Sequence, residues 1–89
     1  MKTYKFIIKG YVQGVYYRKS VYNNAIKQNF QGSVKNLSNG DVEAVVNLNS
    51  NNFDAFVLIL KKGSSYSKVT NITSTTTDFK IFKDFSILY

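Results

Sequence analysis

Apolar and polar residues alternate along the first segment of the chain. Between residues 4 and 11, the apolar set of alternate positions is Tyr4, Phe6 and Ile8, and the other set is rich in lysine. Strand side chains point alternately to opposite faces, so this pattern predicts a strand with one buried face. From Lys19 to Phe30 the apolar residues pair four positions apart, which predicts a helix that Gly32 ends.

The rest of the chain divides into further short elements. Residues 33–37 and 41–48 form two short runs joined by Asn39-Gly40, a pair that tolerates the positive φ of a tight hairpin. Residues 53–60 carry apolar side chains at helical spacing, with Asn51 and Asn52 as candidate caps and Gly63 as the stop. Residues 69–77 are rich in β-branched side chains and residues 85–89 alternate, so both segments are expected to form strands.

The resulting order is βαββαβ with a short extra C-terminal strand. It predicts an α+β fold, a ferredoxin-like sandwich in which two helices cover one face of an antiparallel sheet. The 89 residues contain no repeat, low-complexity tract or linker, so residues 1–89 are expected to form a single domain. Such a fold does not by itself decide the function.

The composition narrows the chemistry that the domain can perform. The chain has no cysteine and no histidine, which excludes thiol nucleophiles, imidazole bases, disulfides and the usual zinc sites. Asp41 and Glu43 share a strand face and could hold magnesium, but a solvated pair of carboxylates is the simpler interpretation, and we expect neither metal nor cofactor. Without an apolar run of about 20 residues or a signal peptide, the sequence predicts a cytoplasmic protein that does not enter a membrane.

The net charge of +7 favours an anionic partner, such as a phosphorylated small molecule, a nucleic acid or an acidic surface. Arg18 is the only arginine, and it follows a loop with glycines at positions 10 and 14. Glycines can let successive backbone N–H groups converge, the following helix adds its positive end, and a guanidinium can bind two oxygens of one phosphate. These residues alone fit an anion-binding loop and an ordinary turn equally well.

Residues 10–18, Gly-Tyr-Val-Gln-Gly-Val-Tyr-Tyr-Arg, resemble the signature of the acylphosphatase family. Residues 32–36 with the turn and strand after them resemble its second signature, and residues 85–89 are similar to its Phe-x-Ile-x-Tyr ending. The resemblance implies cofactor-free hydrolysis of small acyl phosphates, with phosphate or sulfate as an inhibitor-like anion. It also implies that Asn36 orients the attacking water, and that phosphate is bound by the Arg18 side chain and by the backbone of Gln13, Gly14, Val15, Tyr16, Tyr17 and Arg18.

Several residues depart from the family pattern without removing a catalytic group. Two of them, Leu88 and Ser64-Ser65, put the rigidity of the loops and the contribution of the C-terminal tail in question, and could alter rate or stability without changing the reaction. Tyr17 replaces the usual Phe, Asn39 a common Asp, Ser33 an aromatic residue, Leu88 a basic residue, and Ser64-Ser65 a segment that often contains proline.

Two other functions fit the same topology. One is a small RNA-binding module, because Lys9-Gly10-Tyr11 and Tyr16 echo an aromatic RNA-binding motif, but residues 12–14 break that motif and it belongs on another strand. The other is an accessory domain that binds an acyl or carbamoyl phosphate for a partner, which a chain with no second domain supports poorly. We therefore expect no nucleic-acid partner, and the small size and mostly polar helix faces predict a monomer.

Overall fold

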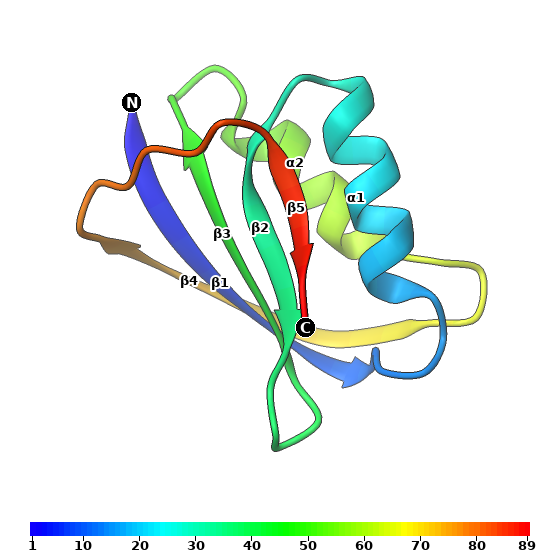
Figure 1. Ribbon diagram of the computed structural model, residues 1–89. Helices are drawn as coiled ribbons and strands as arrows, with labels where there is room; N and C mark the ends of the chain where they lie inside the picture. The colour runs from blue at the N-terminus through cyan, green and yellow to red at the C-terminus, as the bar shows by residue number, and fades with distance from the viewer.

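The computed structural model describes residues 1–89 and has two helices packed on one face of a five-stranded sheet (Figure 1). The predicted order of elements and the α+β ferredoxin-like fold are confirmed. Neither helix is long and apolar enough to cross a membrane. The elements are β1 (Lys2–Tyr11), α1 (Tyr17–Lys27), β2 (Gln31–Asn36), β3 (Val42–Leu48), α2 (Phe53–Lys62), β4 (Lys68–Thr77) and β5 (Phe85–Leu88).

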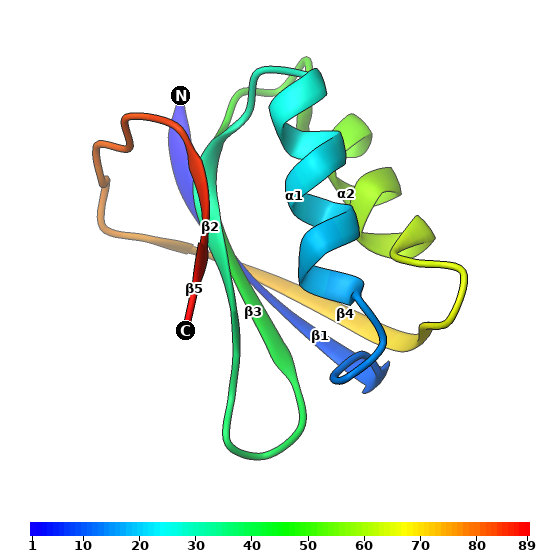
Figure 2. The same cartoon turned by 45° about the vertical axis from the view of Figure 1, so that its right-hand side comes forward.

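The strands lie in the order β4-β1-β3-β2-β5, with β4 and β5 at the two edges. The pairs β1–β4, β1–β3 and β2–β3 are antiparallel, as expected, whereas β2 and β5 are parallel, so the sheet is mixed. The reason is the connection between the edge strands. Residues 78–84 cross from one edge of the sheet to the other over the face opposite the helices, so β5 enters beside β2 in the same direction (Figure 2).

Polar contacts fix this crossing segment to the sheet. Thr3 and Asn47 are buried and hydrogen-bonded to each other across β1 and β3. The Lys80 N–H donates to Thr3 Oγ1 at 3.0 Å, and Asn47 Nδ2 donates to the Lys80 carbonyl at 2.8 Å. The crossing therefore has specific anchors at the ends of the two central strands, which position the start of β5.

The core lies between the sheet and the helices. Alternate residues of the central strands are fully buried there, in agreement with the sequence pattern, whereas Lys5 and Lys9 on the other face of β1 are exposed. Burying one large apolar side chain stabilises the folded state by about 1.5–3 kcal/mol relative to leaving it exposed. The buried residues that form this interface include Phe6, Ile8, Val42, Ala44, Val46 and Leu48 from the sheet and Val21, Ala25, Phe56 and Leu60 from the helices.

The first helix begins and ends earlier than the sequence predicted. It ends at Lys27, and Asn29 then takes a left-handed conformation with φ 61° while the Phe30 N–H donates to the Ala25 carbonyl at 2.9 Å. Gly32 does not end the helix. It lies in β2, where a Cβ would stand 2.2 Å from the Val45 carbonyl oxygen, so it is needed for close strand contact.

The second helix has the predicted boundaries but not the predicted cap. Asn52 precedes α2 and Gly63, with φ 51°, follows it. The Asn52 side chain makes no capping bond to the helix; its Oδ1 instead accepts a hydrogen bond from the Asn49 N–H at 2.9 Å. Asp54 in the first turn is the negative group that lies near the positive end of this helix.

Candidate active site

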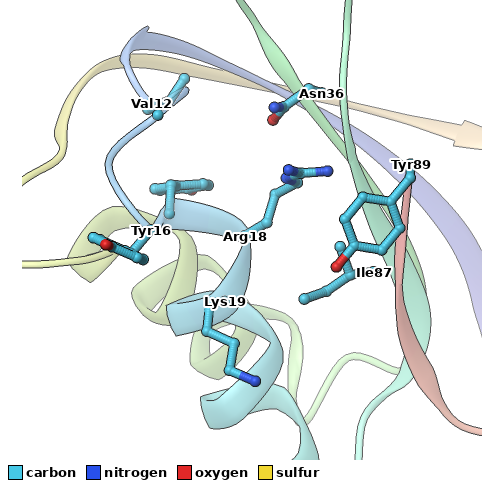
Figure 3. Close-up of a pocket in the computed structure, with 9 residues that line it drawn as sticks. Val12, Tyr16, Arg18, Lys19, Asn36, Ile87 and Tyr89 are labelled. Atoms are coloured by element: carbon cyan, nitrogen blue, oxygen red, sulfur yellow. The ribbon is translucent and has the colours of Figure 1, made fainter.

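A cavity of about 360 Å³ lies where the loop between β1 and α1 meets the ends of β2 and β5 (Figure 3). The three segments that carried the family resemblance, far apart in the sequence, therefore meet at one place. Its lining residues are Val12, Gly14, Tyr16, Tyr17, Arg18, Lys19, Asn36, Ile87 and Tyr89.

The loop presents backbone donors that have no partner. Gly14 and Tyr16 have left-handed backbones, with φ 74° and 62°, an arrangement that bends a chain into a concave surface. The N–H groups of residues 13–18 donate to no acceptor among the backbone bonds outside the regular elements. Those of the first helical turn, which starts at Tyr17, have no acceptor within the helix. The positive end of α1 is added to these donors.

The Gln13 side chain anchors the loop to the connection between β2 and β3. Its Nε2 donates to the Leu37 carbonyl at 2.8 Å and to the Asp41 carbonyl at 2.7 Å, in the connection between β2 and β3. The sequence assigned only the backbone of Gln13 to the site and missed this side-chain role. The side chain attaches the loop to the hairpin next to Asn36, so the two parts of the cavity are held together.

Two further contacts fix the loop on the other side. Val15 is buried, and its carbonyl accepts a hydrogen bond from Ser64 Oγ. The Tyr17 ring is also buried and its hydroxyl donates to the Leu60 carbonyl at 2.7 Å, near the end of α2. Burial raises the pKa of Tyr17 above its ordinary value, so this hydroxyl is neutral at physiological pH. The loop is thus anchored through its side chains and the Val15 carbonyl.

Only one of the two loop glycines bends the loop. Gly10, expected to help the N–H groups converge, lies within β1 at an irregularity in its pairing with β4. Its φ is 133°, and a Cβ there would stand 2.1 Å from the Lys68 carbonyl oxygen. Gly10 therefore allows β4 to approach, whereas Gly14 shapes the cavity.

Arg18 points into the cavity from the first turn of α1, toward the space between Asn36 and Tyr89 (Figure 3). Its Nη1 donates to the Leu88 carbonyl at 3.1 Å, and its guanidinium carbon lies 5.0 Å from the centre of the Tyr89 ring. The ion pairs of the chain join Lys9 to Asp41 and Lys35 to Glu43, so no carboxylate neutralises Arg18. The guanidinium is therefore held in place by neutral groups and not by an ion pair.

Asn36, the last residue of β2, projects its amide into the cavity opposite the loop (Figure 3). Its Oδ1 is buried and accepts no hydrogen bond from the protein. Buried acceptors without a donor are rare in native proteins and need an explanation. Here the acceptor faces a cavity, where a bound molecule can supply the missing donor.

Of the site residues predicted from the sequence, Gly14, Tyr16, Tyr17, Arg18 and Asn36 line this cavity, and the structure adds groups from the end of the chain. Gln13 and Val15 belong to the same loop but do not line the cavity. The similarity of residues 85–89 to the family's ending was the one signal for Ile87, for the Leu88 carbonyl and for the Tyr89 ring. The Leu88 carbonyl acts through the backbone, so the replacement of a basic residue there leaves this contact intact.

The carboxylates considered for magnesium have other partners. Lys9 Nζ lies 2.8 Å from Asp41 Oδ2, and Lys35 Nζ lies 3.8 Å from Glu43 Oε1. The structure holds no group of three or more carboxylate, cysteine or histidine side chains that could ligate a metal. Asp41 also accepts a hydrogen bond from Asn39, so it stabilises the hairpin turn.

Comparisons with a family model and with known sequences point to the same family. The acylphosphatase family model matches residues 4–87. An acylphosphatase of Bacillus subtilis is 39% identical over 90 residues, covering 100% of this chain and 99% of the relative. An acylphosphatase of Vibrio parahaemolyticus is 35% identical over 88 residues, covering 99% of this chain and 98% of the relative.

Solved structures agree. The crystal structure of the Bacillus subtilis acylphosphatase matches with a TM-score of 0.92 and 39% identity, over 100% of both chains. Full-length HypF in its phosphate- and nucleotide-bound form matches with a TM-score of 0.82 and 28% identity, over 99% of this chain but 12% of HypF. On its sequence, its fold and the residues that meet at its cavity, the chain belongs to the acylphosphatase family, whose members are enzymes that hydrolyse acyl phosphates.

Proposed function

We propose that the backbone N–H groups of residues 13–18 and the Arg18 guanidinium bind the phosphate of the acyl phosphate. The observation that carries this assignment is the run of unpartnered N–H groups at the start of a helix. Such groups and the positive helix end attract an anion, and the planar guanidinium can donate to two phosphate oxygens at once. The donors are fixed before the substrate arrives, which lets them stabilise charge on the transferring phosphoryl group without reorganisation.

We propose that Asn36 orients the attacking water. Its buried Oδ1 lacks a donor, and a water that donates to it can direct a lone pair at the phosphorus. The water oxygen then forms a bond to phosphorus while the bond from phosphorus to the acyl oxygen breaks. The carboxylate leaves with that electron pair, and the water protons pass to the phosphate product and to solvent.

This reaction asks little of acid–base catalysis. A carboxylate is stable without protonation, so no general acid is needed at the leaving group. No histidine, cysteine, aspartate or glutamate side chain lines the cavity, so none of the most common general acids or bases stands there. The proposed contributions of the loop, Arg18 and Asn36 are therefore to position the reactants and to stabilise charge on the phosphoryl group.

Backbone NMR with inorganic phosphate tests the binding site. Phosphate should shift the amide signals of residues 13–18 in the wild type and inhibit hydrolysis competitively, and sulfate should act in the same way. Arg18→Ala should weaken both effects, whereas Lys83→Ala, which leaves this cavity unchanged, should weaken neither. Saturable shifts confined to other residues would contradict the assignment.

We also propose that residues 1–89 act as one domain, as a monomer and in the cytoplasm. The family model spans residues 4–87 and the core is continuous between both helices and the sheet. Light scattering coupled to size exclusion tests the oligomeric state against the chain mass of 10.1 kDa. Fractionation of cells that express the protein tests its location.

A further inference from the structure

A second cavity, of about 340 Å³, adjoins the catalytic one at the loop. Five residues line it: Tyr11, Gly14, Val15, Tyr16 and Tyr66. Gly14 and Tyr16 also line the catalytic cavity, so the two spaces meet at the loop that carries the unpartnered N–H groups. None of the lining side chains is charged, although the chain as a whole carries a net charge of +7. We call this space the tyrosine cavity.

The three tyrosines of this cavity are much more exposed than core packing requires. Tyr11, Tyr16 and Tyr66 are 64%, 73% and 69% exposed, and the Tyr16 and Tyr66 ring centroids are 6.3 Å apart. Figure 3 shows the Tyr16 side chain leaving the loop away from Arg18, toward neither Asn36 nor Tyr89. Large exposed apolar groups gathered at one place are typical of a ligand site.

Two features keep the tyrosine cavity shaped and open. The Ser64 Oγ bond to the Val15 carbonyl fixes the segment between α2 and β4, which carries Tyr66, against the loop. At Gly14, which borders both cavities, an added Cβ would meet no atom within 4 Å. A molecule whose phosphate binds the loop N–H groups can therefore continue past Gly14 into the tyrosine cavity.

We propose that the tyrosine cavity binds the acyl group of the substrate and selects acyl phosphates with an aromatic acyl group. This inference rests on the proposed phosphate site, because that site fixes where the acyl group begins. Tyrosine rings pack favourably against a planar ring. The residues that line the cavity include no cation to pair with a charged acyl group, so acyl groups with a second carboxylate are selected against.

Steady-state kinetics with benzoyl phosphate and acetyl phosphate test the selection. The double variant Tyr11→Ala/Tyr66→Ala should lower kcat/KM for benzoyl phosphate about ten-fold, the upper range for an aromatic contact, chiefly through KM. Acetyl phosphate, which is too short to reach the tyrosine cavity, should keep its kcat/KM within about two-fold. Tyr66→Phe should retain the preference because it keeps the ring.

Phe79→Ala is the matched control, since Phe79 is 60% exposed and lies in the crossing segment rather than at the loop. It should change neither substrate. An equal loss for both substrates in the double variant, or no loss for either, would overturn the proposal. Arg18→Ala separates the two hypotheses. If this variant hydrolyses both substrates at the wild-type rate, the proposed phosphate site is wrong. If it loses activity on both substrates but the tyrosine variants show no selectivity between them, only the proposed acyl site is wrong.

Discussion

The two helices begin in opposite chemical surroundings, although neither has a side-chain cap. At the start of α2, Asp54 places a negative charge near the positive end of the helix. The first turn of α1 has no acidic residue and instead contains Arg18 and Lys19, after a left-handed Tyr16. A carboxylate at such a position typically stabilises a helix by about 0.3–1 kcal/mol, so α1 forgoes this contribution.

The difference supports the proposed phosphate site at α1, whose backbone donors must stay free for the anion. An acidic residue or a capping side chain at α1 would use the N–H groups that the proposed phosphate site needs. The start of α1 is instead held in place by the buried Tyr17 ring and by the hydrogen bond from its hydroxyl to the Leu60 carbonyl.

The largest effect is expected from Arg18→Ala. Removing one preorganised donor to a transition state typically costs about 2.7–4 kcal/mol, so kcat/KM should fall about 10²–10³-fold. Arg18→Lys keeps the charge but not the planar pair of donors, and it should fall between the wild type and the alanine variant. A spectrophotometric assay with benzoyl phosphate measures this; an alanine variant as fast as the wild type would contradict the role of Arg18.

Asn36→Ala should act on turnover. Loss of the group that positions the water should lower kcat on the order of 10²-fold, while the inhibition constant for phosphate changes little. Asn71→Ala, on the exposed edge strand β4, is the control and should match the wild type. If Asn36→Ala instead weakened phosphate and left kcat intact, Asn36 would be a phosphate ligand and not a water-positioning group.

Changing one charge at each helix start tests this difference between α1 and α2 directly. Lys19→Glu gives α1 the acid that α2 has, and it should raise stability by about 0.3–1 kcal/mol while raising KM, most strongly at low salt. Asp54→Asn should lower stability by a similar amount with no change in KM. Urea unfolding and salt-dependent kinetics measure both. An unchanged KM in Lys19→Glu would show that the field at α1 does not assist binding.

Tyr17→Phe is expected to have the smallest effect on activity. It leaves the Leu60 carbonyl without its donor, at a cost of about 1 kcal/mol in the free energy of unfolding at pH 7, and kcat/KM should not change. Because burial raises the pKa of Tyr17, the native state keeps this proton above pH 10, where the unfolded chain loses it. This contribution to wild-type stability is present below that pH and is lost as the pH rises, and the Phe variant lacks it.

Urea unfolding at pH 7 and at about pH 11, above the ordinary pKa of tyrosine, measures this difference. The stability gap between the wild type and Tyr17→Phe should narrow at the higher pH. Tyr22→Phe, which removes the hydroxyl of a half-buried tyrosine in the same helix, is the control. A gap that widened with pH would mean that the Tyr17 hydroxyl ionises more readily in the folded protein.

Local patterns predicted most of the fold because alternation and helical spacing report which side of an element is buried. The buried faces of β1 and β3 follow directly from that spacing. The parallel pairing of β5 could not be predicted, because it depends on the contacts of Lys80 with Thr3 and Asn47, which are distant in sequence. That crossing segment also covers part of the sheet face that an RNA-binding module would expose.

The site was predictable only in part, for a similar reason. The family motif identified the loop, Arg18 and Asn36, and all of them lie at one cavity. The two Gln13 side-chain bonds join residues 24 and 28 positions apart, and the Arg18 bond to Leu88 joins residues 70 positions apart. No local pattern records such pairs. Gly10 and Gly32 were misinterpreted because a glycine required for close strand contact looks the same in a sequence as one required for a turn or a helix end.

The β5 strand gives the site a thermal weakness of its own. It has four residues and pairs with β2 alone, and short edge strands open at a lower free-energy cost than central ones. Each opening takes the Leu88 carbonyl and the Tyr89 ring away from Arg18 while the core between the helices and the central strands stays folded. On heating, activity should therefore decline before the cooperative unfolding of the core, and fast hydrogen exchange at residues 85–88 should report the same event.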